Sequence, residues 1–152
     1  MEHSEAVSPV EAISRRVREA RKRKDMTAQE LADRLKASGV GWDRQTVTKL
    51  ETGRRQNVSV VEWLALARAL DVAPVHLLVP LEAGGSYQVT PNERANFERV
   101  RYWVRGLVPL GRTRVRIWNT EVPAAELQAW DEDQERGRSA DGEQEHQEEA
   151  ER

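Results

Sequence analysis

The stretch that decides the fold is residues 27–55, with the sequence TAQELADRLKASGVGWDRQTVTKLETGRR. Thr27 is followed three residues later by Glu30, which is the spacing of a capping box, in which each side chain satisfies an unpaired backbone donor of the other residue. Apolar residues then recur at helical spacing, namely Leu31, Ala32 and Leu35. These features predict a helix over 28–37.

A second helix is predicted over 44–52, after a turn that contains two glycines. Asp43 can cap its first turn, and Trp42 and Val47 have the spacing of a hydrophobic staple across that cap. Two helices joined by a short turn, the second opening with long polar side chains, form the layout of a helix-turn-helix. In that motif the second helix enters the major groove of DNA.

Further helices are predicted on both sides of this motif. Capping boxes precede helical patterns over 9–24 and 60–70, and a fifth short helix should end near Leu78. The expected DNA-binding domain, built from these five helices, spans residues 9–80.

The chain after the candidate boundary at 80–86 (PLEAGGS) is less regular. Residues 87–90 are expected to form a short strand. The capping box TPNE predicts a sixth helix over 91–105, and alternation of polar and apolar residues predicts a strand over 112–118. We expect the small region 81–120 to serve as a dimerisation element or a ligand surface, or to be an appendage of the first domain.

Charge is segregated along the chain, although its formal net charge is only −2. Residues 1–80 carry +3 and residues 81–120 carry +4, whereas residues 121–152 carry −9. The basic body favours an anionic partner, because the field that a partner meets is local. The acidic segment has few apolar residues, so we expect a mostly disordered tail that is solvated or that acts in interaction or shielding.

Composition argues against several classes of function. The chain has no cysteine, which removes disulfides and thiolate sites and fits a reducing cytoplasm. Its histidines, His3, His76 and His146, are far apart in sequence, so we expect no metal site and no catalytic triad. No apolar run approaches the roughly 18 residues of a membrane span, and no secretory signal is visible. We therefore expect a non-enzymatic protein without a cofactor, in the cytoplasm and associated with the nucleoid.

Several separated segments resemble the XRE family, the helix-turn-helix family of phage lambda repressor and Cro. The matching stretches are residues 21–27 (RKRKDMT), 30–32 (ELA), 46–55 (TVTKLETGRR) and 58–78 (VSVVEWLALARALDVAPVHLL). The resemblance covers roughly residues 9–79. It implies a mainly α fold, with a five-helix lambda-repressor-like DNA-binding domain followed by the small helix-plus-strand region and the acidic tail.

The predicted helix over 44–52 supplies the candidates for base reading. Arg44 can pair with guanine, and Gln45 with adenine, through two hydrogen bonds each. Lys49 shares their face, because residues three or four apart are neighbours on a helix surface. The resemblance carries the base-contacting role to these three residues, with Thr46 and Thr48 as lesser candidates. The alternative is an ordinary solvated face.

Two segments are candidates for phosphate contacts: the amino end of the helix over 28–37 and the loop after residue 52. The residues concerned are Thr27, Ala28, Gln29, Arg54, Arg55 and Asn57. The family often has a glutamine where this chain has Ala28. Gln29 would point about 100° around the helix from that position, so the backbone amides, at the positive end of the helix dipole, are the expected donors.

The resemblance also implies an ion pair between Arg21 and Glu51. It would lock the helix over 9–24 to the helix over 44–52, so its role is architectural.

These observations predict a sequence-specific DNA-binding transcriptional regulator, a repressor of bacterial or phage origin that binds double-stranded operator DNA as a homodimer. One alternative is an antitoxin that regulates its own operon through the same motif and offers residues 81–152 to a protein partner. The other is a coactivator-type adaptor, which would bind random and selected DNA equally.

Overall fold

The computed structural model of the chain describes residues 6–112, 118, 122–126 and 128. The chain divides into two compact units, residues 1–107 and 108–152. Residues 124–126 of the second unit are helical. Most of the predicted strand over 112–118 and the predicted disordered tail lie outside the described residues.

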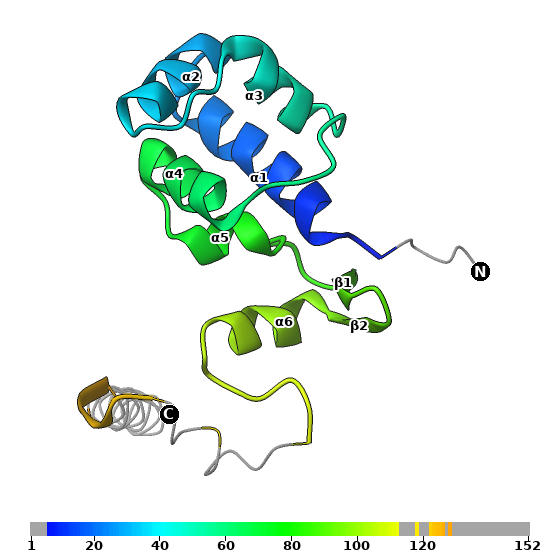
Figure 1. The fold of residues 1–152 in the computed structure, drawn as a ribbon. Helices are drawn as coiled ribbons and strands as arrows, with labels where there is room; N and C mark the ends of the chain where they lie inside the picture. The colour runs from blue at the N-terminus through cyan, green and yellow to red at the C-terminus, as the bar shows by residue number, and fades with distance from the viewer. Residues whose placement is uncertain (1–5, 113–117, 119–121, 127, 129–152) are drawn as a thin grey trace, which may run out of the picture. The chain divides into compact units, whose positions relative to one another are not determined.

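Five helices form the first part of the chain (Figure 1): α1 (Pro9–Arg23), α2 (Ala28–Ala37), α3 (Arg44–Glu51), α4 (Val60–Leu70) and α5 (Pro74–Leu78). The first four begin at the predicted caps, because a side chain there accepts a hydrogen bond from the backbone N–H three residues on; these caps are Ser8, Thr27, Asp43 and Ser59. The capping boxes of α2 and α4 are complete. The mainly helical fold predicted from the sequence is confirmed.

One apolar core lies among these helices. Its fully buried side chains include Val17, Leu31, Leu35, Leu50, Leu66 and Leu70. Trp42 and Val47, the predicted staple, are both buried in it. Because burying one such side chain contributes about 1.5–3 kcal/mol, the apolar side of α3 is firmly fixed and its polar side faces outward.

A small sheet and a sixth helix complete the first unit. Strand β1 (Ser86–Thr90) pairs antiparallel with β2 (Glu93–Asn96), and α6 (Phe97–Val104) follows at once. The predicted strand at 87–90 is confirmed. None of the helices in the described part of the chain is long and apolar enough to cross a membrane.

The start of the chain also joins this sheet. The backbone N–H of Val7 donates to the carbonyl oxygen of Ser86 at 2.8 Å, and the N–H of Gln88 donates to that of Val7 at 2.9 Å. The phenol of Tyr87 donates to the carbonyl oxygen of Leu78 at 2.8 Å, and its burial raises the pKa of Tyr87. These bonds tie β1 both to the segment before α1 and to α5.

The sixth helix is shorter than the sequence predicted. The TPNE box was expected to start it at Pro91, but that residue lies in the turn between the two strands. The helix begins instead after Asn96, whose side chain accepts a hydrogen bond from the N–H of Arg99 at 2.8 Å. The prediction was wrong because the same polar residues also suit a tight turn, and the pairing of β2 with β1 decides between the two.

Gly85 makes a close approach that only glycine allows. Its φ is 89°, and a Cβ atom at this position would overlap the ring of Phe97. We expect Gly85→Ala to lower the free energy of unfolding by about 2 kcal/mol, because backbone strain and overpacking add. Urea unfolding measures the loss. Gly84→Ala is the matched control, since its φ is 75° but the space around it is open. Equal unfolding midpoints for the two variants would mean that the ring contact contributes nothing.

Candidate nucleic-acid interface

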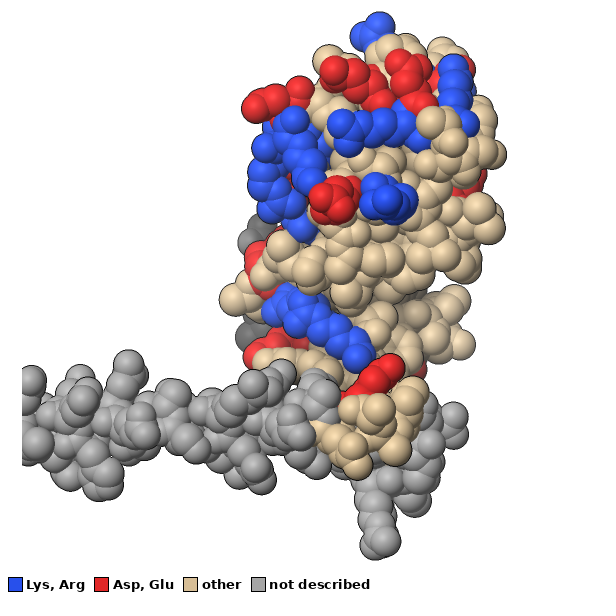
Figure 2. All heavy atoms as spheres, turned by 90° about the vertical axis from the view of Figure 1, so that its left-hand side faces the viewer, with Lys and Arg blue, Asp and Glu red and all other residues tan. Residues whose placement is uncertain are grey.

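The face of the molecule that carries α2, α4 and α5 is unevenly charged (Figure 2). Lys and Arg side chains gather toward its upper end, where α2 lies, with Asp and Glu among them. Below them a broad area lacks charged side chains. On α4 three apolar side chains are exposed, namely Val60, Val61 and Leu64, at 67%, 68% and 47%. Within the described residues, no three His, Asp or Glu side chains lie together as a metal site requires.

The outward side of α3 gathers the predicted base-reading residues. Exposed on it are Arg44, Gln45, Thr48 and Lys49. The inward side packs into the core through Val47 and Leu50, which are fully buried. Because the core fixes the inward side, the long polar side chains are presented as one row.

The hydroxyls of the two threonines of α3 are bonded within the helix and its cap. The Thr46 hydroxyl donates to the carboxylate of Asp43 at 2.7 Å, and the Thr48 hydroxyl donates to the carbonyl oxygen of Arg44 at 3.0 Å. Hydrogen bonds from the side chain and backbone of Thr46 hold the pKa of Asp43 below its ordinary value. Thr46 is therefore engaged in the helix cap and partly buried.

An open hollow of about 450 Å³ lies between α2 and α3, lined by Gln29, Lys36, Asp43, Arg44, Gln45 and Thr48. Gln29 lines this hollow, and its side-chain amide donates to Asp33 at 2.9 Å. The N–H groups in the first turn of a helix have no acceptor within it, so Ala28 and Gln29 present theirs outward. The N–H of Glu30 is instead bonded to the Thr27 hydroxyl at 3.1 Å.

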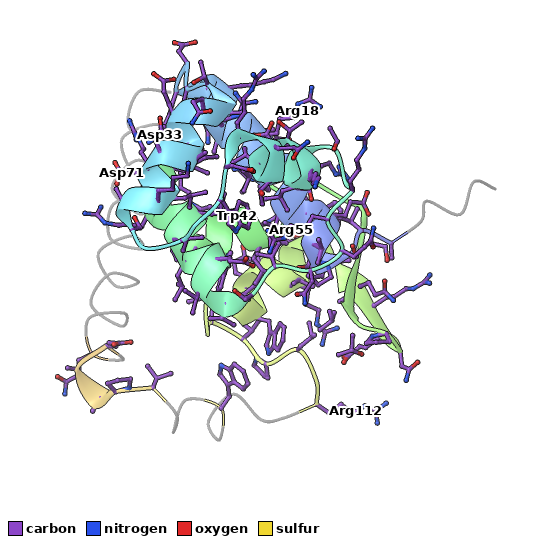
Figure 3. The ribbon with its side chains drawn as sticks, turned by 45° about the horizontal axis from the view of Figure 1, so that its top comes forward. Arg18, Asp33, Trp42, Arg55, Asp71 and Arg112 are labelled. Atoms are coloured by element: carbon purple, nitrogen blue, oxygen red, sulfur yellow. The ribbon has the colours of Figure 1, made fainter. Side chains whose placement is uncertain are left out.

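A second hollow, of about 610 Å³, follows α3 and is lined by Lys49, Arg54, Arg55, Gln56, Asn57, Ser59 and Glu62. Arg54 and Asn57 are exposed there. Arg55 is held: its guanidinium carbon lies 4.3 Å from the centre of the Trp42 ring, and Figure 3 shows the two residues beside each other. Its Nε donates to the carbonyl oxygen of Asn57 at 2.8 Å. The loop therefore combines one exposed guanidinium with one that is fixed.

Glu62 has contacts that the sequence did not reveal. The capping box predicted only its bond to the Ser59 backbone N–H, which is 2.8 Å long. Its carboxylate also accepts hydrogen bonds from Trp42 at 3.0 Å and from Arg55 at 2.5 Å. Burial raises the pKa of Glu62, but these hydrogen bonds outweigh it and hold the pKa below the ordinary value. One signal in the sequence could have indicated such a contact: the indole N–H of a buried Trp42 needs a hydrogen-bond acceptor.

An ion pair joins α1 to α3. The Arg21 guanidinium donates to both carboxylate oxygens of Glu51, at 2.6 and 2.8 Å, and also to the carbonyl oxygen of Met26 at 2.6 Å. The two charged side chains are only 14% and 7% exposed. The hydrogen bonds to Glu51 raise the pKa of Arg21. The last turn of α3 is thereby attached to α1.

Part of the chain is similar to known proteins. Residues 12–79 match the model of a family described as a helix-turn-helix domain. The chain is similar to a restriction-modification controller protein of solved structure, C.AhdI from Aeromonas hydrophila. The two are 38% identical, with 45% of this chain and 94% of the controller covered, at a TM-score of 0.39. No curated protein matches the chain.

The chain belongs to the XRE family of helix-turn-helix regulators, as the sequence resemblance implied. It is a DNA-binding regulator.

Proposed function

We propose that this protein is a sequence-specific transcriptional regulator that reads operator DNA in the major groove with α3. The observation that carries the proposal is the exposed row of Arg44, Gln45 and Lys49 on a helix whose other side is buried. An α-helix fits the major groove, where each base pair presents a distinct pattern of donors and acceptors. The proposal includes repression, in a bacterial or phage setting, since occupying an operator needs no further activity.

The proposed contacts divide into two kinds. Arg44 and Gln45 read base edges together with Lys49, and Thr46 and Thr48 stay secondary because their hydroxyls are already bonded within the helix and its cap. Phosphates are held by the backbone N–H groups of Ala28 and Gln29 at the amino end of α2 and by the loop residues Arg54, Arg55 and Asn57. Thr27 stays secondary there, because its N–H and its hydroxyl already donate to Glu30. Phosphate contacts position the protein on DNA without carrying sequence information.

Selection of bound sequences from a random DNA pool, followed by footprinting of the enriched site, tests this function. We expect one sequence family to be enriched and its major-groove edges to be protected. Equal binding of random and selected DNA would contradict base reading and favour the adaptor alternative.

The homodimer is part of the same proposal. A dimer of this motif binds two half-sites about one helical turn apart, so the selected site should be palindromic. The exposed apolar side chains of α4, which lie within about one turn of that helix, support association, because large exposed apolar patches mark interaction surfaces. The dimer would be contradicted by a selected site without two-fold symmetry, together with a light-scattering mass that corresponds to one protein chain on the DNA.

Arg54 is expected to contact a phosphate. Arg54→Ala should weaken binding to all sequences alike and lower the slope of log affinity against log salt by about one. Affinities measured over a series of salt concentrations provide the slope. Arg68→Ala is the control, because Arg68 is an exposed arginine of α4 that does not line the hollow after α3. An unchanged slope for Arg54→Ala would remove this loop from the interface.

The acidic segment is expected to compete with DNA. Residues 121–152 carry −9 and the rest of the chain +7, and a tethered polyanion competes with phosphates at high effective concentration. Deleting residues 131–152 should therefore tighten binding to random DNA at low salt, and the gain should fade as salt screens the charges. Unchanged affinity at low salt would mean that the acidic segment only solvates the chain or binds a protein partner, as in an antitoxin. Co-purification would test for that partner.

A further inference from the structure

Glu62 contacts one residue that precedes α3 in the sequence and one that follows it. Its Oε1 accepts the indole N–H of Trp42 at 3.0 Å and a guanidinium N–H of Arg55 at 2.5 Å, while its Oε2 accepts the backbone N–H of Ser59. Trp42 lies just before α3 and Arg55 just after it. Arg55 also stacks on the Trp42 ring (Figure 3). The three side chains, called here the Glu62 cluster, therefore connect the two ends of α3 through α4.

The orientation of α3 depends on what holds its ends. The helix has eight residues, and isolated helices shorter than about 12–15 residues are marginal in water. The backbone N–H groups of Arg54 and Arg55 both donate to the carbonyl oxygen of Lys49, at 2.9 and 3.1 Å. The backbone of Arg55 is thus attached to the last turn of α3, and the pairing of its side chain with Glu62 connects that turn to α4.

The cluster requires a carboxylate at position 62. Indole, guanidinium and backbone N–H groups can only donate hydrogen bonds, so Glu62 must accept at both oxygens. A glutamine amide has one accepting oxygen and one donating NH₂ group. In Glu62→Gln the NH₂ group of the amide would lie against another hydrogen-bond donor. That donor would be either the backbone N–H of Ser59 or the N–H groups of Trp42 and Arg55. The negative charge also balances Arg55 within the cluster.

We infer that Glu62 is a positioning residue for DNA recognition: the Glu62 cluster sets the angle at which α3 presents Arg44, Gln45 and Lys49 to the bases. This inference rests on the proposed base reading by α3. Its consequence is a loss of discrimination between selected and random DNA when the cluster is broken, although none of its residues reads a base.

The test compares full-length variants by the ratio of affinities for the selected site and for random DNA. Glu62→Gln should lower this ratio about 2- to 30-fold, the range by which mutations away from a site modulate coupling. Glu30→Gln is the matched control, because Glu30 holds the same position in the capping box of α2 and its hydrogen bonds reach only Thr27. A change in net charge near DNA affects both affinities and leaves the ratio unchanged.

Two further variants separate the cluster from phosphate binding. Trp42→Phe keeps an aromatic ring for stacking but loses the indole N–H, and Arg55→Lys keeps the charge but loses the planar guanidinium. Both should lower the affinity ratio, whereas a residue that only binds phosphate would weaken both affinities equally. These variants also test the cluster if Glu62→Gln does not fold.

Hydrogen exchange without DNA distinguishes failure of the inference from failure of base reading. The backbone amides of α3 should exchange faster in Glu62→Gln than in Glu30→Gln. If the unaltered protein prefers no DNA sequence, base reading is wrong, and exchange of the α3 amides alone decides whether the cluster holds the helix. Equal α3 exchange in the two variants overturns the inference, and so does an unchanged affinity ratio in all three cluster variants.

Discussion

Replacing Glu51 by alanine is expected to lower the free energy of unfolding by about 3 kcal/mol, the lower end of the range for a broken buried pair, because it leaves a partly buried guanidinium without its counter-charge. Arg21 is only 14% exposed and donates two hydrogen bonds to Glu51. Its third hydrogen bond goes to the carbonyl oxygen of Met26, which cannot balance the charge. Urea unfolding followed by circular dichroism measures the loss.

Two further variants show whether the loss of stability comes from the unpaired charge of Arg21. Glu11→Ala removes an exposed carboxylate that pairs loosely with Arg15 at 3.8 Å, and should cost well under about 1 kcal/mol. Replacing both partners, as Arg21→Met with Glu51→Leu, should recover most of the stability, because no unpaired charge remains. If Glu51→Ala were as stable as Glu11→Ala, the pair would not hold α1 to α3.

The double variant Arg44→Ala with Gln45→Ala is expected to lose about 2–6 kcal/mol of binding free energy at the selected site, since each two-bond base contact contributes about 1–3 kcal/mol. Lys49→Ala should lose an amount in the range of a single contact. Non-specific binding should change far less, because it depends on phosphate contacts. Fluorescence anisotropy with the selected site and with random DNA, at one salt concentration, provides both affinities.

Arg54→Ala is the reference for this comparison, because it should weaken both kinds of DNA alike. Binding to DNA altered at one base pair then assigns each contact: Arg44→Ala should become indifferent to the guanine that Arg44 reads. Equal losses of affinity on random and selected DNA for the double variant would show that this face of α3 does not read bases.

Local contacts made the helices predictable from sequence. A cap such as Thr27 or Asp43 accepts a hydrogen bond from a backbone N–H three residues away, so both partners lie within one turn of the sequence. The burial of Trp42 and Val47 follows the same logic, since the staple spans a single cap. The outward position of the polar residues of α3 could be predicted from helical periodicity alone, because the apolar residues on the opposite side pack into the core.

Contacts between distant residues could not be read in this way. Val7 pairs with Tyr87, and that pairing helps to make residues 86–96 a sheet where part of the segment had the pattern of a helix start. Glu62 had a complete local explanation in its capping box, and nothing in that pattern shows that it also accepts hydrogen bonds from Trp42 and Arg55.

The sequence by itself determined where each of the first four helices begins and which side of α3 faces outward, because those choices depend on neighbours within about one turn. Only the tertiary structure decided how α3 is held. Its ends are fixed by Arg21 through Glu51 and by the Glu62 cluster. Such bonds depend on the distance between folded elements, which a local pattern of residues does not encode.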